Sequence, residues 1–216
     1  MSETARSRIL GRLRAAPVTA APALPAWEAP TYAAGERVGR FCELLRNLHA
    51  EVYEVTLADW PYRLRTLLEE RGIGSVMFAP TTEAGRRLTS AWGDIGPKLV
   101  PYDRPVEDLK DTLVHGVEAG FTTAQGGIAE TGTLVLWPNG DEPRLLSLLP
   151  PVHIALVRAD AIVDNLAGLM RGQGWAARMP TNVVLVSGPS KTADIEQTLA
   201  YGVHGPKELI VLVVGD

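Results

Sequence analysis

Short runs of consecutive apolar residues recur along this chain and alternate with segments of helical periodicity. The runs at residues 183–186 and 209–214 are apolar at every position, which is typical of strands covered on both faces by helices. Strands are expected at residues 52–56, 75–79, 99–102, 112–117, 133–137, 154–158, 183–186 and 209–214. Helices are expected at residues 37–49, 59–70, 144–149, 160–170 and 192–201. This alternation predicts an α/β protein with three α/β/α layers around a mostly parallel sheet.

Composition places the chain among ordinary globular proteins. Of its 216 residues, 46% are hydrophobic and 21% are charged, which is ordinary for a globular protein. A chain of this length can bury a full hydrophobic core. The formal net charge of −4 does not indicate the positively charged surface that binds nucleic acid or an anionic membrane. The longest apolar stretches are far shorter than the roughly 18 residues of a membrane span. We therefore expect a soluble, cytoplasmic protein.

The first 32 residues differ from the rest and predict a separate segment. Arginines at positions 6, 8, 12 and 14 surround Ile9, Leu10 and Leu13. A transit peptide is one interpretation, but Glu3 and the lack of a secretory-type apolar core favour a short amphipathic helix that docks on the body or on a neighbouring subunit. Residues 15–30 are rich in Ala and Pro and predict an extended arm. We therefore divide the chain into this helix and arm, residues 1–32, and an α/β domain, residues 33–216.

Cysteine and histidine give no sign of a metal centre in this chain. Cys42 is the single cysteine, which excludes an internal disulfide and a cluster held by about four thiolates. Its apolar neighbours predict a buried, structural thiol. The histidines at positions 49, 115, 153 and 204 show no metal-ligand spacing. His204 is the one expected to face a ligand, because a Gly-Pro turn follows it directly.

Three polar, glycine-rich segments lie where strand patterns break off: residues 126–133, 187–194 and 204–207. Loops that leave the ends of parallel strands converge on one rim of an open α/β sheet, where such folds bind ligands. The three segments therefore predict one shared site.

The segment 187–194 predicts an anion site at the start of a helix. Ser190, Lys191, Thr192 and Asp194 follow a Ser-Gly-Pro turn and open the predicted helix 192–201. Unpaired amides at a helix start favour a phosphate or carboxylate. In the alternative interpretation, Ser190 or Thr192 only caps the helix. The segment is not a Walker loop, because Ser190 stands where that motif needs its second glycine.

The segment 126–133 offers one carboxylate, Glu130, between glycines and hydroxyls. Near the rim it would act as a general base, a nucleophile or a hydrogen-bond acceptor. The alternative is a turn in which Gly126, Gly127 and Gly132 supply unusual dihedral angles while Glu130 faces water.

Three blocks carry a resemblance to a known family. They are GGIAETGTLVL, RLLSLLPPVHIALV and SGPSKTADIEQTLAYGVHGPKELIVLVV. In this order and spacing, from about Val114 to the C-terminus, the chain resembles the LUD-domain family, which includes the lactate-utilisation protein C (LutC/YkgG-like) proteins. The resemblance implies the fold of the sugar-isomerase and CoA-transferase-like (NagB/RpiA) superfamily.

The resemblance also implies a function. Such proteins support the oxidation of L-lactate to pyruvate together with iron–sulfur partner proteins. This chain has no cluster ligands, flavin signature or credible dinucleotide loop, so the resemblance implies a substrate-binding or organising subunit with no cofactor of its own. Two alternatives stay open: a non-catalytic assembly subunit, and a stand-alone enzyme acting on a phosphorylated sugar, a CoA thioester or a folate. Oligomerisation is compatible with each.

The family blocks imply a set of site residues. Glu130 and His204 are the expected catalytic groups, one of which accepts the substrate's hydroxyl proton. A nest at residues 190–192 with Lys191 is expected to hold the substrate carboxylate. The expected binding residues are Gly127, Thr131, Gly132, Thr133, Ser187, Gly188, Ser190, Lys191, Thr192 and Asp194.

Overall fold

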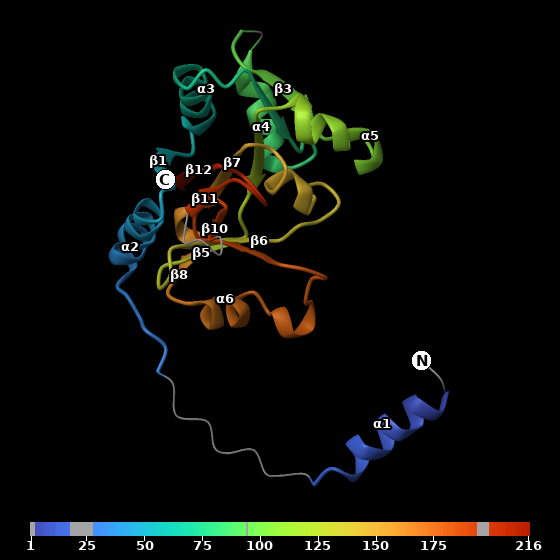
Figure 1. The fold of residues 1–216 in the computed structure, drawn as a ribbon. Helices are drawn as coiled ribbons and strands as arrows, with labels where there is room; N and C mark the ends of the chain where they lie inside the picture. The colour runs from blue at the N-terminus through green and yellow to red at the C-terminus, as the bar shows by residue number, and fades with distance from the viewer. Residues whose placement is uncertain (1–2, 18–27, 94, 194–198) are drawn as a thin grey trace.

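The computed structural model describes residues 3–17, 28–93, 95–193 and 199–216 (Figure 1). A six-stranded sheet lies at its centre, and every neighbouring pair of its strands is parallel. In spatial order the strands are β1 (Glu51–Thr56), β12 (Glu208–Gly215), β7 (Val152–Arg158), β4 (Ala119–Thr123), β2 (Ser75–Phe78) and β3 (Lys98–Pro101). The predicted parallel sheet is therefore confirmed.

Helices cover both faces of this sheet. Along β12, Ile210 and Leu212 belong to one core cluster and Val211 and Val213 to another, and each is at most 2% exposed. Because successive side chains of a strand alternate between its faces, a strand without polar positions needs cover on both sides. One face packs against α3 (Trp60–Glu70) and α4 (Glu83–Trp92), and the other against α2 (Ala34–Asn47). The α/β/α layering is confirmed.

A smaller sheet carries two of the polar segments. Its spatial order is β8 (Ile162–Val163), β5 (Gly126–Ile128), β6 (Thr133–Leu136) and β9 (Val184–Val186). The pairs β5–β6 and β6–β9 are antiparallel. Helix α6 (Leu166–Gly172) and the 3-10 turn η4 (Trp175–Ala177) pack on it through Leu169 and Trp175. Figure 1 shows this sheet between the parallel sheet and α6.

The helix predicted at residues 192–201 is wrong at the positions that the structure describes, while residues 194–198 lie outside them. The chain instead forms β10 (Lys191–Ala193) and β11 (Leu199–Tyr201), which pair antiparallel. The ends of this hairpin are held by tertiary hydrogen bonds: Ser190 N donates to Pro206 O, and Gly202 N donates to Ser190 O. Gly202 also turns the chain with a φ of 76°, a conformation that favours glycine. These contacts outweigh the local helical pattern.

Other segments differ from expectation for similar reasons. Residues 112–117, predicted as a strand, form the π-helical turn η1 (Thr112–Gly116), which continues α5 (Val106–Asp111) and buries Leu113 against Met77. The helix predicted at residues 160–170 is interrupted by β8, and α6 starts only after Asn165, whose Oδ1 accepts a bond from Gly168 N. The segment 144–149 contains the 3-10 turn η2 (Arg144–Ser147), and the 3-10 turn η3 (Ala159–Ala161) precedes β8. Strands β4 and β5 and helices α4 and α5 were not predicted.

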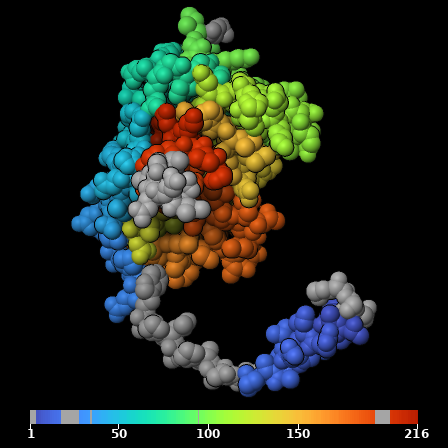
Figure 2. All heavy atoms as spheres, in the orientation of Figure 1, coloured from blue at the N-terminus to red at the C-terminus, as the bar shows by residue number. Residues whose placement is uncertain are grey.

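Helix α1 (Glu3–Ala15) lies apart from the α/β body, as the space-filling view shows (Figure 2). Its apolar side chains Ile9 and Leu13 are 50% and 66% exposed. The helix forms as expected, while its docking on the body or on a neighbouring subunit stays a prediction. Cys42 is fully buried, and burial raises the pKa of its thiol to about 11, consistent with the predicted structural role. None of the described helices is long and apolar enough to cross a membrane.

Candidate functional site

A cavity of about 190 Å³ opens where β7 and β12 begin, and we call it the amino-edge cavity. His153 and Leu209, paired in register near the starts of these strands, form part of its wall. The remaining lining comes from the end of the 3-10 turn η2, from β9 and the loop that follows it, and from the loop that precedes β12. The lining residues are Ser147, Leu148, His153, Val184, Leu185, Val186, Ser187, Gly188, Pro189, Ser190, His204, Gly205, Pro206 and Leu209.

Hydrogen bonds join the three glycine-rich segments to one another, and the second and third of them line this cavity. Thr133 Oγ1 lies 2.7 Å from Thr131 Oγ1 and 2.7 Å from Ser187 Oγ, so a chain of hydroxyls joins the first segment to the second. Ser190 N donates to Pro206 O at 2.9 Å and joins the second segment to the third. The segments do not meet where strands of the parallel sheet leave it. The third segment precedes β12, and the first two belong to the smaller sheet.

Two histidines line the cavity and differ in environment. His204 is exposed, as expected of a residue that faces a ligand. His153 is 2% exposed, and its Nε2 lies 2.9 Å from Thr122 Oγ1. Burial lowers the pKa of His153 to about 4, so this imidazole is neutral near pH 7. It therefore offers hydrogen bonding rather than charge.

Sequence reasoning missed His153 and Ser147 as lining residues. His153 lies near the start of β7 and forms its hydrogen bond with Thr122 of the neighbouring strand β4. Ser147 lies on η2 and donates its hydroxyl to Arg144 O at 2.9 Å. The available signal was a histidine within the apolar run of residues 152–157, since a buried polar side chain is more informative than an exposed apolar one.

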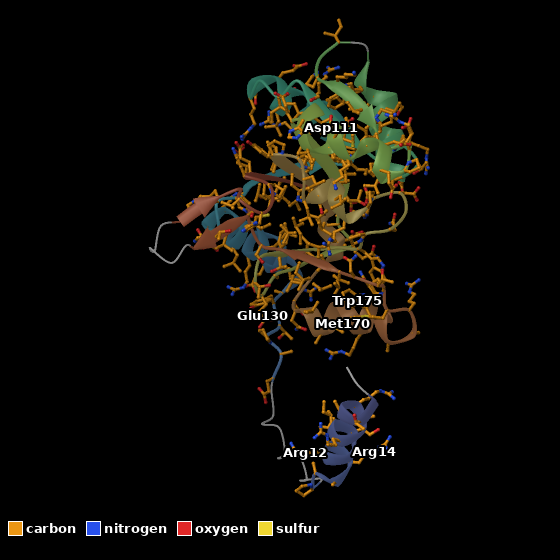
Figure 3. All side chains as sticks on the ribbon, turned by 45° about the vertical axis from the view of Figure 1, so that its right-hand side comes forward. Arg12, Arg14, Asp111, Glu130, Met170 and Trp175 are labelled. Carbon is orange, nitrogen blue, oxygen red and sulfur yellow. The ribbon has the colours of Figure 1, made fainter. Side chains whose placement is uncertain are left out.

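Glu130 lies outside the amino-edge cavity. It belongs to the loop between β5 and β6, where its amide donates to Asp164 O and its carbonyl accepts from Arg40 Nη2. Its carboxylate makes no hydrogen bond or ion pair with a residue that the structure describes. Figure 3 shows Glu130 at the end of the smaller sheet, on the side from which the N-terminal arm leaves the body.

The predicted glycines serve packing and turns. A Cβ on Gly132, which has a φ of 61°, would lie 2.5 Å from Leu44 Cβ. A Cβ on Gly127 would lie 2.8 Å from the Phe41 ring, and one on Gly188 would lie 2.8 Å from Leu48 O. These positions need glycine because α2 and the residues after it pack directly on the polar segments.

The predicted anion nest is not formed as expected, because no helix begins at residues 190–192. Lys191 and Thr192 lie on β10 and do not line the cavity, and Asp194 lies outside the described residues. Among the residues that the structure describes, no Lys, Arg, Asp or Glu lines the cavity. In the part of the chain that the structure describes, no group of three or more His, Cys, Asp and Glu could hold a metal ion. The cavity is therefore suited to a small polar molecule bound by hydroxyls and imidazoles.

The fold is that of an α/β protein with a cavity where the smaller sheet and its loops meet the start of the parallel sheet. The LUD domain model matches residues 38–214, and the chain belongs to this family. It is 38% identical over 180 residues to an uncharacterised protein, NMB1437, from Neisseria meningitidis serogroup B, covering 83% of this chain and 77% of the relative. It is 31% identical over 195 residues to lactate utilization protein C of Bacillus licheniformis, covering 86% of this chain and 81% of the relative. It is 37% identical over 198 residues to lactate utilization protein C of Halalkalibacterium halodurans, covering 86% of this chain and 82% of the relative.

A solved structure supports the fold. The crystal structure of a DUF162 family protein from Deinococcus radiodurans superposes with a TM-score of 0.64, covering 85% of this chain and 99% of that one, at 24% sequence identity. At this level of identity the likeness concerns the fold alone.

Proposed function

We propose that this chain acts in L-lactate utilisation as a substrate-binding or organising subunit beside iron–sulfur partner proteins. Membership of the LUD family and likeness to proteins named lactate utilization protein C support the role in lactate use. The observation that carries the substrate-binding role is a cavity of about 190 Å³ lined by Ser187, Ser190 and His204, which belong to two of the three polar segments. A cavity of that size takes a small molecule.

The lining groups suggest how a 2-hydroxy acid would be held. The hydroxyls of Ser187 and Ser190 would donate hydrogen bonds to its carboxylate, and His204 would accept its hydroxyl proton. Oxidation of lactate to pyruvate releases two electrons and two protons. In this proposal His204 takes the hydroxyl proton, while the electrons and the proton from C2 leave to the partner proteins. Of the two proton acceptors expected from the sequence, His204 is favoured over Glu130 because only His204 lines the cavity.

The lining also weighs against a phosphorylated substrate at this site. Phosphate recognition favours Arg and Lys side chains, and neither residue is among those that line the amino-edge cavity. We therefore prefer lactate utilisation over stand-alone action on a sugar phosphate.

An affinity purification of the tagged chain from its native cells grown on L-lactate tests the function. The eluate is assayed for iron and for lactate-dependent dye reduction. We expect both in the wild type. We expect His204→Asn to retain iron but to lose dye reduction by roughly 10²-fold or more, the scale of general-base catalysis. His115→Asn, which changes an exposed histidine on η1, is the matched control and should keep full activity.

The outcomes separate the alternatives. Loss of iron together with activity in His204→Asn would favour an assembly subunit whose polar loops bind the partners. A wild-type eluate without iron or activity would contradict the proposed function.

A further inference from the structure

A second cavity, of about 250 Å³, opens at the opposite edge of the parallel sheet, and we call it the carboxyl-edge cavity. Its apolar lining includes Trp60, Leu156 and Val214, and its polar rim includes Glu83, Arg87 and Arg158. None of the described residues of the three polar segments lines it. Ligands of open parallel α/β sheets bind at this edge, outside the carboxyl ends of the strands.

The two cavities are separated by the length of β7. His153, near the start of this strand, lines the amino-edge cavity, whereas Leu156 and Arg158, toward its end, line the carboxyl-edge cavity. At about 3.3 Å per residue, the five steps from His153 to Arg158 span roughly 16 Å. A ligand at one edge therefore occupies a site distinct from the other.

The guanidinium of Arg87 lines this cavity and has no hydrogen-bond or ion-pair partner among the residues that the structure describes. The side chain is half-buried, and Glu83 lies four residues earlier on α4, a spacing that permits a pair. Arg158, in contrast, forms two hydrogen bonds with Asp160, at 3.0 and 2.7 Å. A partly desolvated cation favours an anionic partner, and guanidinium binds carboxylate in bidentate geometry.

The apolar wall selects the rest of the ligand. Trp60 stacks on Phe121 with ring centroids 5.6 Å apart, which fixes the ring in place. The cavity volume lies below the roughly 300–1,000 Å³ typical of sites for drug-sized molecules. The space therefore suits one ring or one branched chain.

We propose that the carboxyl-edge cavity is a second ligand site, which binds a small monocarboxylate carrying an apolar ring or branched chain. Its carboxylate pairs with Arg87 and its hydrocarbon part contacts Trp60, Leu156 and Val214. This site is independent of the proposed lactate site.

Titration of the full chain with benzoate, followed by backbone amide NMR shifts, tests the proposal. Benzamide is the uncharged probe of the same shape. We expect saturable shifts around Thr123 and Ala124, with benzamide binding roughly tenfold more weakly or worse, the scale of a charged hydrogen bond. Arg87→Gln should bring benzoate down to the affinity of benzamide. Arg171→Gln, which alters an exposed arginine outside the lining of this cavity, should change neither affinity.

A second variant keeps the proposal testable if Arg87→Gln does not fold. Ala84→Leu adds volume to the cavity wall without altering Arg87 and should weaken both probes equally. The proposal would be overturned by an absence of saturable benzoate binding, by equal affinities of benzoate and benzamide for the wild type, or by shifts confined to residues 187–190. A folded Arg87→Gln variant that binds benzoate as the wild type does would overturn it as well.

Discussion

The parallel sheet and the smaller sheet use their side chains differently. Every residue of β12 from Leu209 to Val214 is at most 4% exposed, whereas Leu185 of β9, in the smaller sheet, is 50% exposed. The first polar segment connects the inner strands β5 and β6 of the smaller sheet and the second follows its edge strand β9, and their hydroxyls bond to one another. The difference indicates that β12, in the interior of the parallel sheet, contributes more to stability than β9, the edge strand of the smaller sheet whose following loop lines the amino-edge cavity.

A matched pair of leucine truncations tests this division most strongly. Leu212→Ala removes a fully buried side chain and should lower the free energy of unfolding by about 2–5 kcal/mol. Leu185→Ala removes a half-exposed one and should cost less than about 1 kcal/mol. Denaturant titration of both variants measures the difference. Equal losses would show that the smaller sheet is as important for stability as the parallel one.

Gly132 is the position where the smaller sheet is expected to be least tolerant. Gly132→Ala places a Cβ in a left-handed conformation and 2.5 Å from Leu44 Cβ. We expect a loss of about 2–4 kcal/mol, from backbone strain together with overpacking. Gly140→Ala, where nothing lies within 4 Å of the added atom, is the control and should be nearly neutral. A neutral Gly132→Ala would show that α2 does not hold the first polar segment as described.

His153 links the parallel sheet to the cavity and should make stability depend on pH. Its folded-state pKa is about 4, below the ordinary value of 6.5, so between these values the unfolded chain binds the extra proton. Stability should therefore fall as the pH drops from 6.5 toward 4, by at most about 1.4 kcal/mol per pH unit from this group.

His153→Gln should remove that part of the slope, and His115→Gln should leave it unchanged. Unfolding free energies measured across this pH range give the slopes. Identical slopes for the wild type and His153→Gln would contradict the buried, neutral state of this histidine.

The hydroxyl chain is expected to have the smallest effect. Thr133→Val keeps the shape of a side chain that is 5% exposed but removes its bonds to Thr131 and Ser187. The free energy of unfolding should fall by about 1 kcal/mol. Thr181→Val, at an exposed position, should be neutral within about 0.5 kcal/mol. If thermal denaturation shows no difference between the two variants, the chain of hydroxyls does not hold the two segments together.

Much of the parallel sheet was predictable because its strands are buried on both faces. The runs at residues 154–158 and 209–214 correspond to β7 and β12. The hairpin at residues 191–201 was not predictable in this way, since its strands are short and its ends are set by bonds from Ser190 and Gly202 to distant residues. Burial of a strand requires a regular pattern of apolar residues that can be recognised in the sequence, whereas contacts between distant loops leave no such pattern.

The candidate sites also depend on contacts between distant segments, which local sequence patterns predict only in part. Hydrogen bonds join the three polar segments, but only the second and third line the amino-edge cavity, where His204 lies. The position of Glu130 outside that cavity depends on the course of the β5–β6 loop, which no local pattern specifies. The carboxyl-edge cavity was not foreseen, because Arg87 lies on α4, a helix that the sequence analysis did not predict.

The measurement that tests the central claim most directly is a titration of the purified full chain with L-lactate, followed by backbone amide NMR shifts. We predict saturable shifts at Ser187, Ser190 and His204 and markedly weaker binding to His204→Asn, with His115→Asn binding as the wild type does. Shifts confined to the carboxyl-edge cavity, or no shifts at saturating L-lactate, would contradict the claim that the converging polar segments form a lactate site.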